Sequence, residues 1–139
     1  MVKRLNFTYI FCNDLEKMEY FYSEILNLHL IWKDESSIAY GIDGHQLSIT
    51  FAQDFTPFPS VFGKQPGWDG GNAPNISWSL ACDRDDFVEI VSNADRASGV
   101  KAWNPKPQWV GYWSFPLLDP MNHTIEITCT DSRLVFDNN

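Results

Sequence analysis

The chain has 139 residues, of which 44% are hydrophobic and 20% are charged, and this composition suits one folded globular domain. Its net charge of −8 argues against a nucleic-acid partner, because an acidic surface repels phosphate backbones. No apolar run approaches the roughly 18 residues of a membrane span. The N-terminal apolar run is too short for a signal peptide, so we expect a cytoplasmic protein without a membrane partner.

Three features of the composition allow more than one interpretation. Aromatic residues make up 15% of the chain, and such rings either fill a core or line a ligand pocket. The acidic charge either keeps the protein dissolved or favours cationic ligands. Cys12, Cys82 and Cys129 lie in apolar runs without a Cys-x-x-Cys pair, which predicts buried free thiols.

The first half of the chain predicts one helix among four strands. Apolar residues at helical spacing indicate a helix that begins at Asn13 or Asp14, both suitable N-caps, and ends near Asn27. The pair Asp43-Gly44 predicts a tight hairpin turn. The expected strands cover residues 5–12, 28–33, 36–42 and 45–52.

The second half repeats this order after a long connector, predicted at about residues 54–74. The connector is rich in Pro, Gly and aromatic residues without periodicity, and loops of this length usually serve a function. Asp83 and Gly99 are suited to begin and end a second helix. The expected strands cover residues 75–82, 100–103, 110–118 and 123–130, and a polar tail covers 131–139.

Two sequence motifs and the repeated element order identify a family resemblance. Residues 14–17 (DLEK) and 21–22 (FY) match a strand-and-helix opening, and residues 119–127 (DPMNHTIEI) are similar to a D-P-x-G-N-x-I-E-L signature. The chain therefore resembles the vicinal-oxygen-chelate superfamily of glyoxalases, bleomycin resistance proteins and extradiol dioxygenases. It departs from the signature at Asn122 and His123, where Gly and Asn are usual.

The resemblance implies an α+β fold in which two βαβββ modules form a curved, cleft-lined mixed sheet. It implies a single domain over residues 1–139, with module one at about 1–53 and module two at about 75–130. A homodimer and a small-molecule ligand are also implied.

Metal-binding members of the superfamily hold their ion at four positions that correspond to Phe7, Ser48, Asn75 and Glu126 here. Only Glu126 is a good ligand for a divalent ion, and such a site needs about three protein ligands. We therefore expect no cofactor, and a divalent metal only if the true alignment is shifted. His45 and His123 lie at strand starts with the opposite parity to Glu126, so we expect exposed residues beside turns.

Strand alternation and the resemblance together predict the ligand-binding residues. Alternate side chains face one side of a strand, and the cleft should also have aromatic residues at its mouth. The expected cleft residues are Phe7, Tyr9, Phe11, Ser48, Thr50, Asn75, Ser77 and Glu126, and those expected at the mouth are Trp103 and Trp113.

Three functions are compatible with these features. The first is a binding protein, similar to the bleomycin resistance branch, which takes a planar or cationic organic molecule in a metal-free cleft. The second is a metal-dependent glyoxalase-type lyase or isomerase, a dioxygenase or a thiol transferase, and the missing ligands argue against it. The third is a metal-free enzyme with Glu126 as a general base. Whether the protein is an enzyme stays open.

Overall fold

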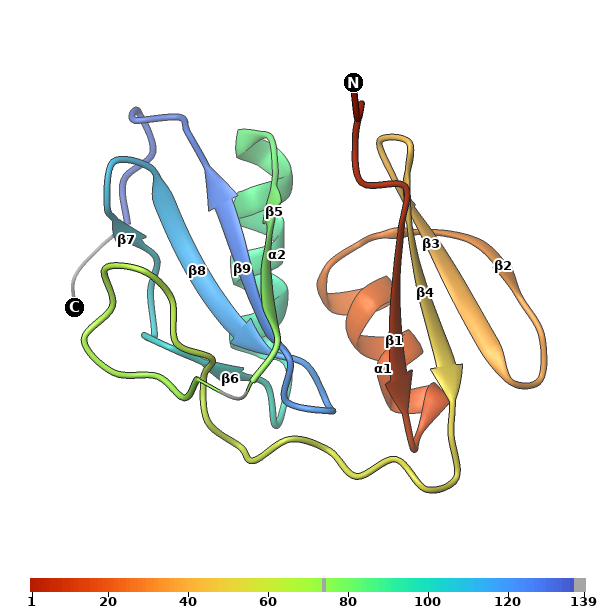
Figure 1. Cartoon of the computed structure of the whole chain (residues 1–139). Coiled ribbons are helices and arrows are strands. Elements are labelled where there is room, and N and C mark those ends of the chain that lie inside the picture. Colours follow the sequence, from red (N-terminus) through yellow and green to blue (C-terminus); the bar gives the residue numbers. More distant parts are fainter. Residues whose placement is uncertain (74, 137–139) are drawn as a thin grey trace. The chain divides into compact units, whose positions relative to one another are not determined.

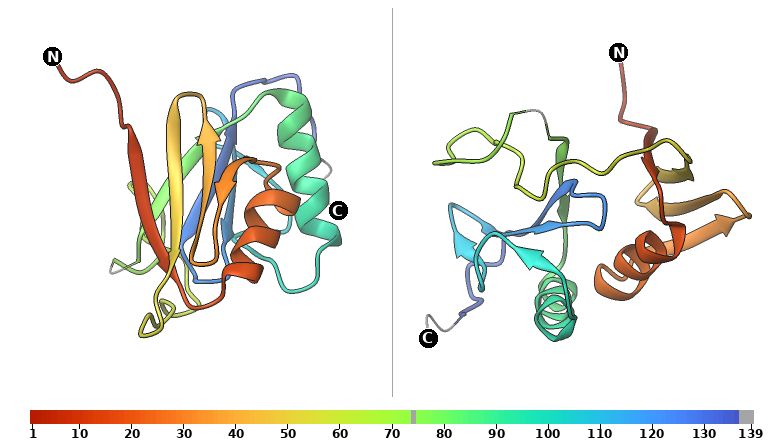
Figure 2. Two further views of the ribbon diagram at one scale, coloured as in Figure 1. Left: turned by 90° about the vertical axis from the view of Figure 1, so that its right-hand side faces the viewer. Right: turned by 90° about the horizontal axis from the view of Figure 1, so that it is seen from below.

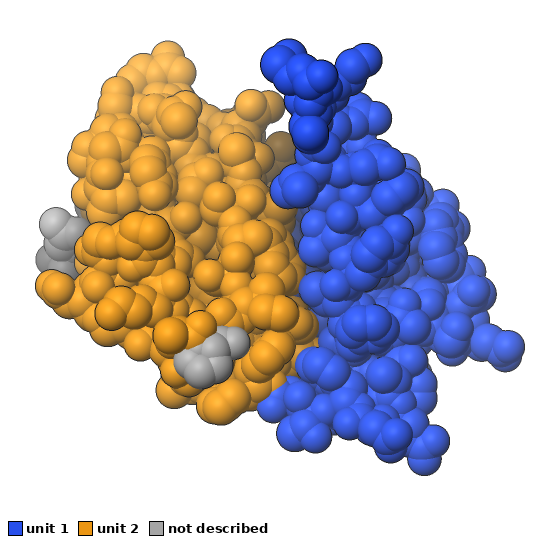
Figure 3. All heavy atoms as spheres, in the orientation of Figure 1, with its two compact units in different colours: residues 1–57 blue, residues 58–139 orange. Residues whose placement is uncertain are grey.

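The computed structural model describes residues 1–73 and 75–136. The chain divides into two compact units, residues 1–57 and 58–139 (Figure 3). The boundary falls inside the predicted connector, most of which belongs to unit 2. The predicted end of the connector at Pro74 and the last three tail residues lie outside the described residues, and the single domain stays a prediction.

Unit 1 contains a four-stranded mixed sheet and one helical segment (Figure 1). The strand order is β1-β4-β3-β2, in which β1 runs parallel to β4 and the other pairs are antiparallel. Its elements are β1 (Phe7–Cys12), α1 (Leu15–Glu19), the π-helical segment η1 (Tyr20–Ile25), β2 (His29–Lys33), β3 (Ser37–Ile42) and β4 (His45–Phe51).

Local sequence explains these element boundaries. The Asp14 side chain accepts a hydrogen bond from the Lys17 backbone N–H at 3.1 Å, so Asp14 rather than Asn13 is the N-cap. Asn27, with φ of 54°, follows the helical segment in a left-handed conformation that Asn tolerates. Asp43 and Gly44 both have positive φ, as the predicted hairpin turn requires.

The core of unit 1 lies between the sheet and the α1–η1 segment. Alternation along β1 buries Ile10 and Cys12 on the helix side and leaves the side chains between them on the opposite face. The apolar stripe predicted for the helix is buried with them. The core residues include Met18, Phe21, Tyr22, Ile25, Leu26, Ile38, Tyr40, Leu47 and Ile49.

Unit 2 repeats the arrangement with one extra short strand. Its sheet has the order β5-β9-β8-β6, with β5 parallel to β9, and β7 also pairs with β8. Helix α2 lies on one face of this sheet, and the connector runs over the other (Figure 2). The elements are β5 (Ser77–Ala81), α2 (Arg84–Arg96), β6 (Lys101–Ala102), β7 (Gln108–Trp109), β8 (Trp113–Leu118) and β9 (Thr124–Cys129).

The strand predicted over residues 110–118 is shorter in the structure. Val110 donates its backbone N–H to the Tyr112 carbonyl at 2.8 Å, and Gly111 has φ of 97°. This tight turn joins β7 to β8, so the strand begins at Trp113. A Gly inside an apolar run was the available signal for a turn.

The fold class is α+β, as the sequence predicted. Unit 1 follows the predicted order βαβββ, and unit 2 follows it with the short strand β7 added before β8. All three cysteines are free thiols; Cys12 and Cys129 are buried and Cys82 is half-buried. Among the described residues, no helix combines the length and the apolar character that crossing a membrane requires.

Candidate functional site

One face of the unit 2 sheet gathers polar side chains, and we call it the connector face because the connector covers part of it. Side chains alternate between the two faces of the sheet along β8 and β9. Phe115, Ile125 and Ile127 point to the α2 side, and the residues next to each of them in its strand point to the connector face. The pairing register aligns Ser79, Glu126 and Pro116 across three strands. Other residues of this face are Ser77, Ser114, Thr124 and Thr128.

Glu126 lies in the middle of the connector face and is only 6% exposed. Its Oε2 accepts a hydrogen bond from the Ser114 hydroxyl at 2.5 Å. Within the described chain, no donor bonds its Oε1 and no cationic side chain forms an ion pair with it. Oε1 is not among the fully buried polar atoms that lack a partner, so it keeps contact with the surface, and this position is suited to a ligand that brings a cation or a hydrogen-bond donor.

Tyr112 also lies within electrostatic reach of Glu126. The negative charge of Glu126 raises the pKa of the Tyr112 phenol, and desolvation adds to this effect. At neutral pH the phenol is protonated and can donate a hydrogen bond. Thus Ser114 bonds the Glu126 carboxylate directly, whereas the exposed Tyr112 feels its charge without a hydrogen bond to it among the described residues.

A pocket of about 240 Å³ borders this group. It touches Glu126's neighbours Ser114 and Pro116, and it carries an acidic side chain, Asp69. Its described lining contains no Lys, Arg or His. The lining residues are Gly67, Trp68, Asp69, Trp103, Gln108, Val110, Ser114 and Pro116.

Two tryptophans form the aromatic wall of this pocket. The Trp68 and Trp103 ring centroids are 4.6 Å apart with a tilt of 32°, and Trp103 also contacts Phe62 edge-on. An aromatic face next to carboxylates attracts cations. Trp103 lines this pocket with the connector ring Trp68 packed against it, and its role at the mouth of a ligand cleft stays a prediction.

The connector is fastened to the sheet by specific hydrogen bonds. The Gly63 backbone N–H donates to the buried Thr124 hydroxyl at 2.7 Å, and the Asn75 amide donates to the Val61 carbonyl at 2.5 Å. A side chain at Gly63 would lie 3.4 Å from Ser77. Asn75 and Ser77, both predicted to bind ligand, therefore support the connector in this structure.

The remaining predicted cleft residues lie in unit 1. Phe7, Tyr9 and Phe11 share one face of β1 and are 46%, 68% and 49% exposed. Ser48 and Thr50 are the register partners of Tyr9 and Phe11 on β4. The Ser48 hydroxyl accepts a hydrogen bond from Gln46, and Thr50 pairs with Ser37, so this face is an aromatic strip beside a polar one.

Trp113 does not join the Glu126 group. It precedes Ser114 in β8 and therefore points to the opposite face of the sheet. There its ring centroid lies 4.9 Å from that of Phe136 and 5.5 Å from that of Trp109. Phe136 in turn contacts Phe87 of α2. The structure thus places Trp113 on the helix side, away from the connector face.

His123 corrects a prediction, because it is 1% exposed rather than solvent-facing. Its Nδ1 lies 2.8 Å from the Asp119 carboxylate, which also accepts the His123 backbone N–H at 2.9 Å. The rings of Phe58 and Trp78 flank the imidazole. Since Asn122 adopts the left-handed φ of 68°, the turn folds back and buries the residue after it. His45 is half-buried and bonds to Thr8.

The four positions that the resemblance assigns to metal binding do not fit a divalent ion. Phe7 has no ligand atom, and the Ser48 hydroxyl is a poor ligand. The Asn75 Nδ2 donates to Val61, so Asn75 offers only its buried amide Oδ1, which is a weak ligand for a divalent transition metal. In the described part of the chain, no group of three His, Cys, Asp or Glu side chains could hold a metal.

Sequence reasoning missed Ser114, Asp69 and Gln108. The alternation in residues 113–118 would have suggested Ser114, but its face depends on the register across the turn at 119–123. A shift of one residue reverses the face. Asp69 and Gln108 lie in loops, for which alternation gives no information.

Comparisons with known proteins agree on a family and a fold. The family model described as Glyoxalase/Bleomycin resistance protein/Dioxygenase superfamily matches residues 4–127. Among curated proteins, none matches the chain in sequence.

Solved structures with a similar fold include proteins of different activities. A glyoxalase/dioxygenase from Nostoc punctiforme has a TM-score of 0.70 and 19% identity, and the match covers 91% of this chain and 90% of that chain. The fosfomycin resistance protein FosX from Mesorhizobium loti has a TM-score of 0.63, 16% identity and 93% coverage of each chain. A lactoylglutathione lyase from Agrobacterium tumefaciens has a TM-score of 0.63 and 16% identity, with 92% and 94% coverage. At these identities the likeness concerns the fold.

Proposed function

Because this chain belongs to the glyoxalase/bleomycin resistance protein/dioxygenase superfamily, we propose that it binds a small, planar organic cation beside Glu126 without a metal ion. One observation carries the proposal: Glu126 is a buried carboxylate whose only hydrogen-bond donor within the described chain is Ser114. A cationic ligand would supply the missing charge.

The adjoining pocket supports the same ligand chemistry. Its Trp68 and Trp103 rings offer an apolar wall, and Asp69 adds a second carboxylate. A cavity of about 150 Å³ holds benzene, so the volume of about 240 Å³ suits a ligand with one or two rings. The net charge of −8 raises the local concentration of cations.

Benzamidine, a planar cation with one ring, is a suitable probe. We expect it to quench tryptophan fluorescence in the presence of a chelator, and we expect added Zn²⁺ or Ni²⁺ to leave its affinity unchanged. Glu126→Gln keeps an acceptor for Ser114 but removes the charge, and should weaken binding about 10- to 150-fold. Glu89→Gln, an exposed change on α2, is the matched control. Binding that requires a metal ion, or that survives Glu126→Gln, would contradict the proposal.

A second candidate is metal-free proton transfer by Glu126. It is favoured by the hydrogen bond from Ser114, which holds Oε2 and leaves Oε1 without a donor in the described chain. Oε1 would accept a proton from a C–H beside a carbonyl, leaving an enolate. The protonated carboxyl would exchange its proton with solvent and then return a solvent-derived proton to the enolate carbon, which restores the carboxylate. Aminoacetone in D₂O tests this candidate: deuterium should enter its C–H positions faster with the wild-type protein than with Glu126→Gln, and equal rates would exclude it.

A further inference from the structure

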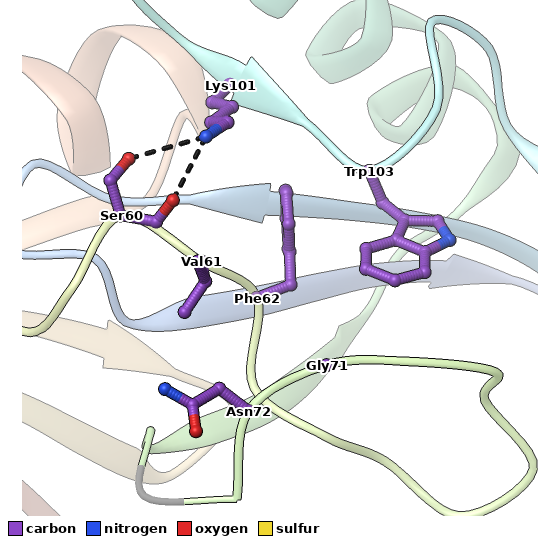
Figure 4. A pocket seen from close by; sticks show the side chains of 7 residues that line it. All are labelled: Ser60, Val61, Phe62, Gly71, Asn72, Lys101 and Trp103. Carbon is purple, nitrogen blue, oxygen red and sulfur yellow. Dashed lines mark hydrogen bonds between the residues drawn. The ribbon is translucent and has the colours of Figure 1, made fainter.

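A second pocket, of about 480 Å³, lies between the connector and β6. The residues that line it come from two connector segments, from β6 and from the position just after β6 (Figure 4). Its lining residues are Ser60, Val61, Phe62, Gly71, Asn72, Lys101 and Trp103.

The charge of this pocket is opposite to that of the pocket beside Glu126. Lys101 is the one charged residue among the described lining residues. Its Nζ donates to the Ser60 carbonyl at 3.0 Å and lies 3.5 Å from the Ser60 hydroxyl (Figure 4). These neutral partners position the ammonium group without neutralising it. No ion pair within the described chain involves Lys101, although the chain carries 18 acidic residues.

The ammonium group has donor capacity to spare. A lysine carries three N–H donors, and the Ser60 carbonyl takes one at good distance while the contact with the hydroxyl is at the limit of a hydrogen bond. At least one donor can therefore bond an oxygen of a ligand. An anionic ligand would gain most, because a hydrogen bond between charged groups is about twice as strong as a neutral one.

The remaining lining gives the pocket an apolar wall and one more polar group. The Phe62 and Trp103 rings meet edge-on with their centroids 5.3 Å apart, and the exposed Val61 lines the same pocket. The backbone of Asn72 is paired with Phe62 and Lys64, whereas no hydrogen bond of its side-chain amide is found among the described residues. The amide is free to bond a polar group of the ligand.

Trp103 lines both pockets, so one ring contributes the apolar wall of an acidic and of a basic pocket. The two differ in the charged side chain that accompanies this ring, Asp69 in one and Lys101 in the other. We propose that the Lys101 pocket binds the carboxylate of a small molecule with a flat apolar body, as a second site that does not depend on the cation site at Glu126.

Benzoate and its neutral analogue benzamide test this proposal by protein-observed NMR titration at low salt. We expect benzoate to shift resonances of residues 60–62, 71, 72 and 101, and to bind at least about fivefold more tightly than benzamide, which corresponds to about 1 kcal/mol. Lys101→Met should remove this preference, Lys101→Arg should keep it, and Lys106→Met, a change on a lysine outside the pocket, should leave it unchanged.

Two results would overturn the proposal: benzoate that binds no better than benzamide, or a preference for benzoate that survives Lys101→Met. The cation site is tested separately, because Lys101→Met should leave benzamidine binding intact and Glu126→Gln should leave benzoate binding intact. Loss of both ligands in either variant would show that the two pockets are not independent, and would also overturn it.

Discussion

Replacing Thr124 by valine should release the connector from the unit 2 sheet. Thr124 is fully buried, and its hydroxyl accepts the Gly63 backbone N–H at 2.7 Å. Valine has nearly the same shape but no acceptor, so the variant leaves a buried N–H group unsatisfied, at a cost of about 1–3 kcal/mol. With an unfolding entropy of about 2.1 cal/mol/K per residue, each kcal/mol lowers the Tm of a 139-residue chain by about 3 °C.

Urea unfolding, followed by circular dichroism and by tryptophan fluorescence, measures this change in the free energy of unfolding. Thr130→Val, at an exposed position just after β9, is the matched control and should change the free energy by less than about 0.5 kcal/mol. If Thr124→Val were no more destabilising than Thr130→Val, the hydrogen bond would not fasten the connector, and our account of how the pocket walls are held would fail.

Three further predictions concern the same unit. Glu126→Gln should lower the pKa of Tyr112, because the charge that raises it is gone. Tyrosinate absorbance during a pH titration measures this pKa, and an unchanged value would show that the Glu126 charge does not act on Tyr112. Gly71→Ala should destabilise the connector by about 1–3 kcal/mol more than Gly67→Ala, as measured by hydrogen exchange and limited proteolysis. Both glycines have positive φ, but a side chain at Gly71 would lie 2.7 Å from the Lys64 backbone and one at Gly67 meets nothing; equal effects would refute the close approach. Burial raises the pKa of the Cys82 thiol to about 11, so its alkylation should be slow at neutral pH and accelerate only in strongly alkaline solution; fast neutral alkylation would argue against that burial.

Much of the fold follows from local patterns in the sequence. The period of the apolar residues predicted the helix that starts after Asp14, and the pair Asp43-Gly44 predicted the hairpin turn between β3 and β4. Both signals act over a few residues, so they can be read from the sequence alone. The repetition of βαβββ was visible for the same reason. The turn at Gly111 was missed because residues on both sides of it are apolar and β-prone.

The candidate site was only partly predictable, because its details depend on tertiary contacts. Alternation predicted that Glu126 and Ser77 share one face, and the register of β5, β8 and β9 has them on the same face, whereas a role of Glu126 in ligand binding stays a prediction. The burial of His123 could not be predicted, since it requires the Phe58 and Trp78 rings from distant segments. Likewise, no periodic signal shows that the connector covers Asn75 and Ser77, because an irregular segment reaches its position through individual hydrogen bonds.

The central claim, that the Glu126 charge recognises a cationic ligand, is tested most directly by four dissociation constants from calorimetry. Benzamidine and neutral benzamide are each titrated into the wild-type protein and into Glu126→Gln. The account predicts that the substitution weakens benzamidine about 10- to 150-fold and leaves benzamide within about twofold. Equal loss for both ligands, or none for benzamidine, would contradict it.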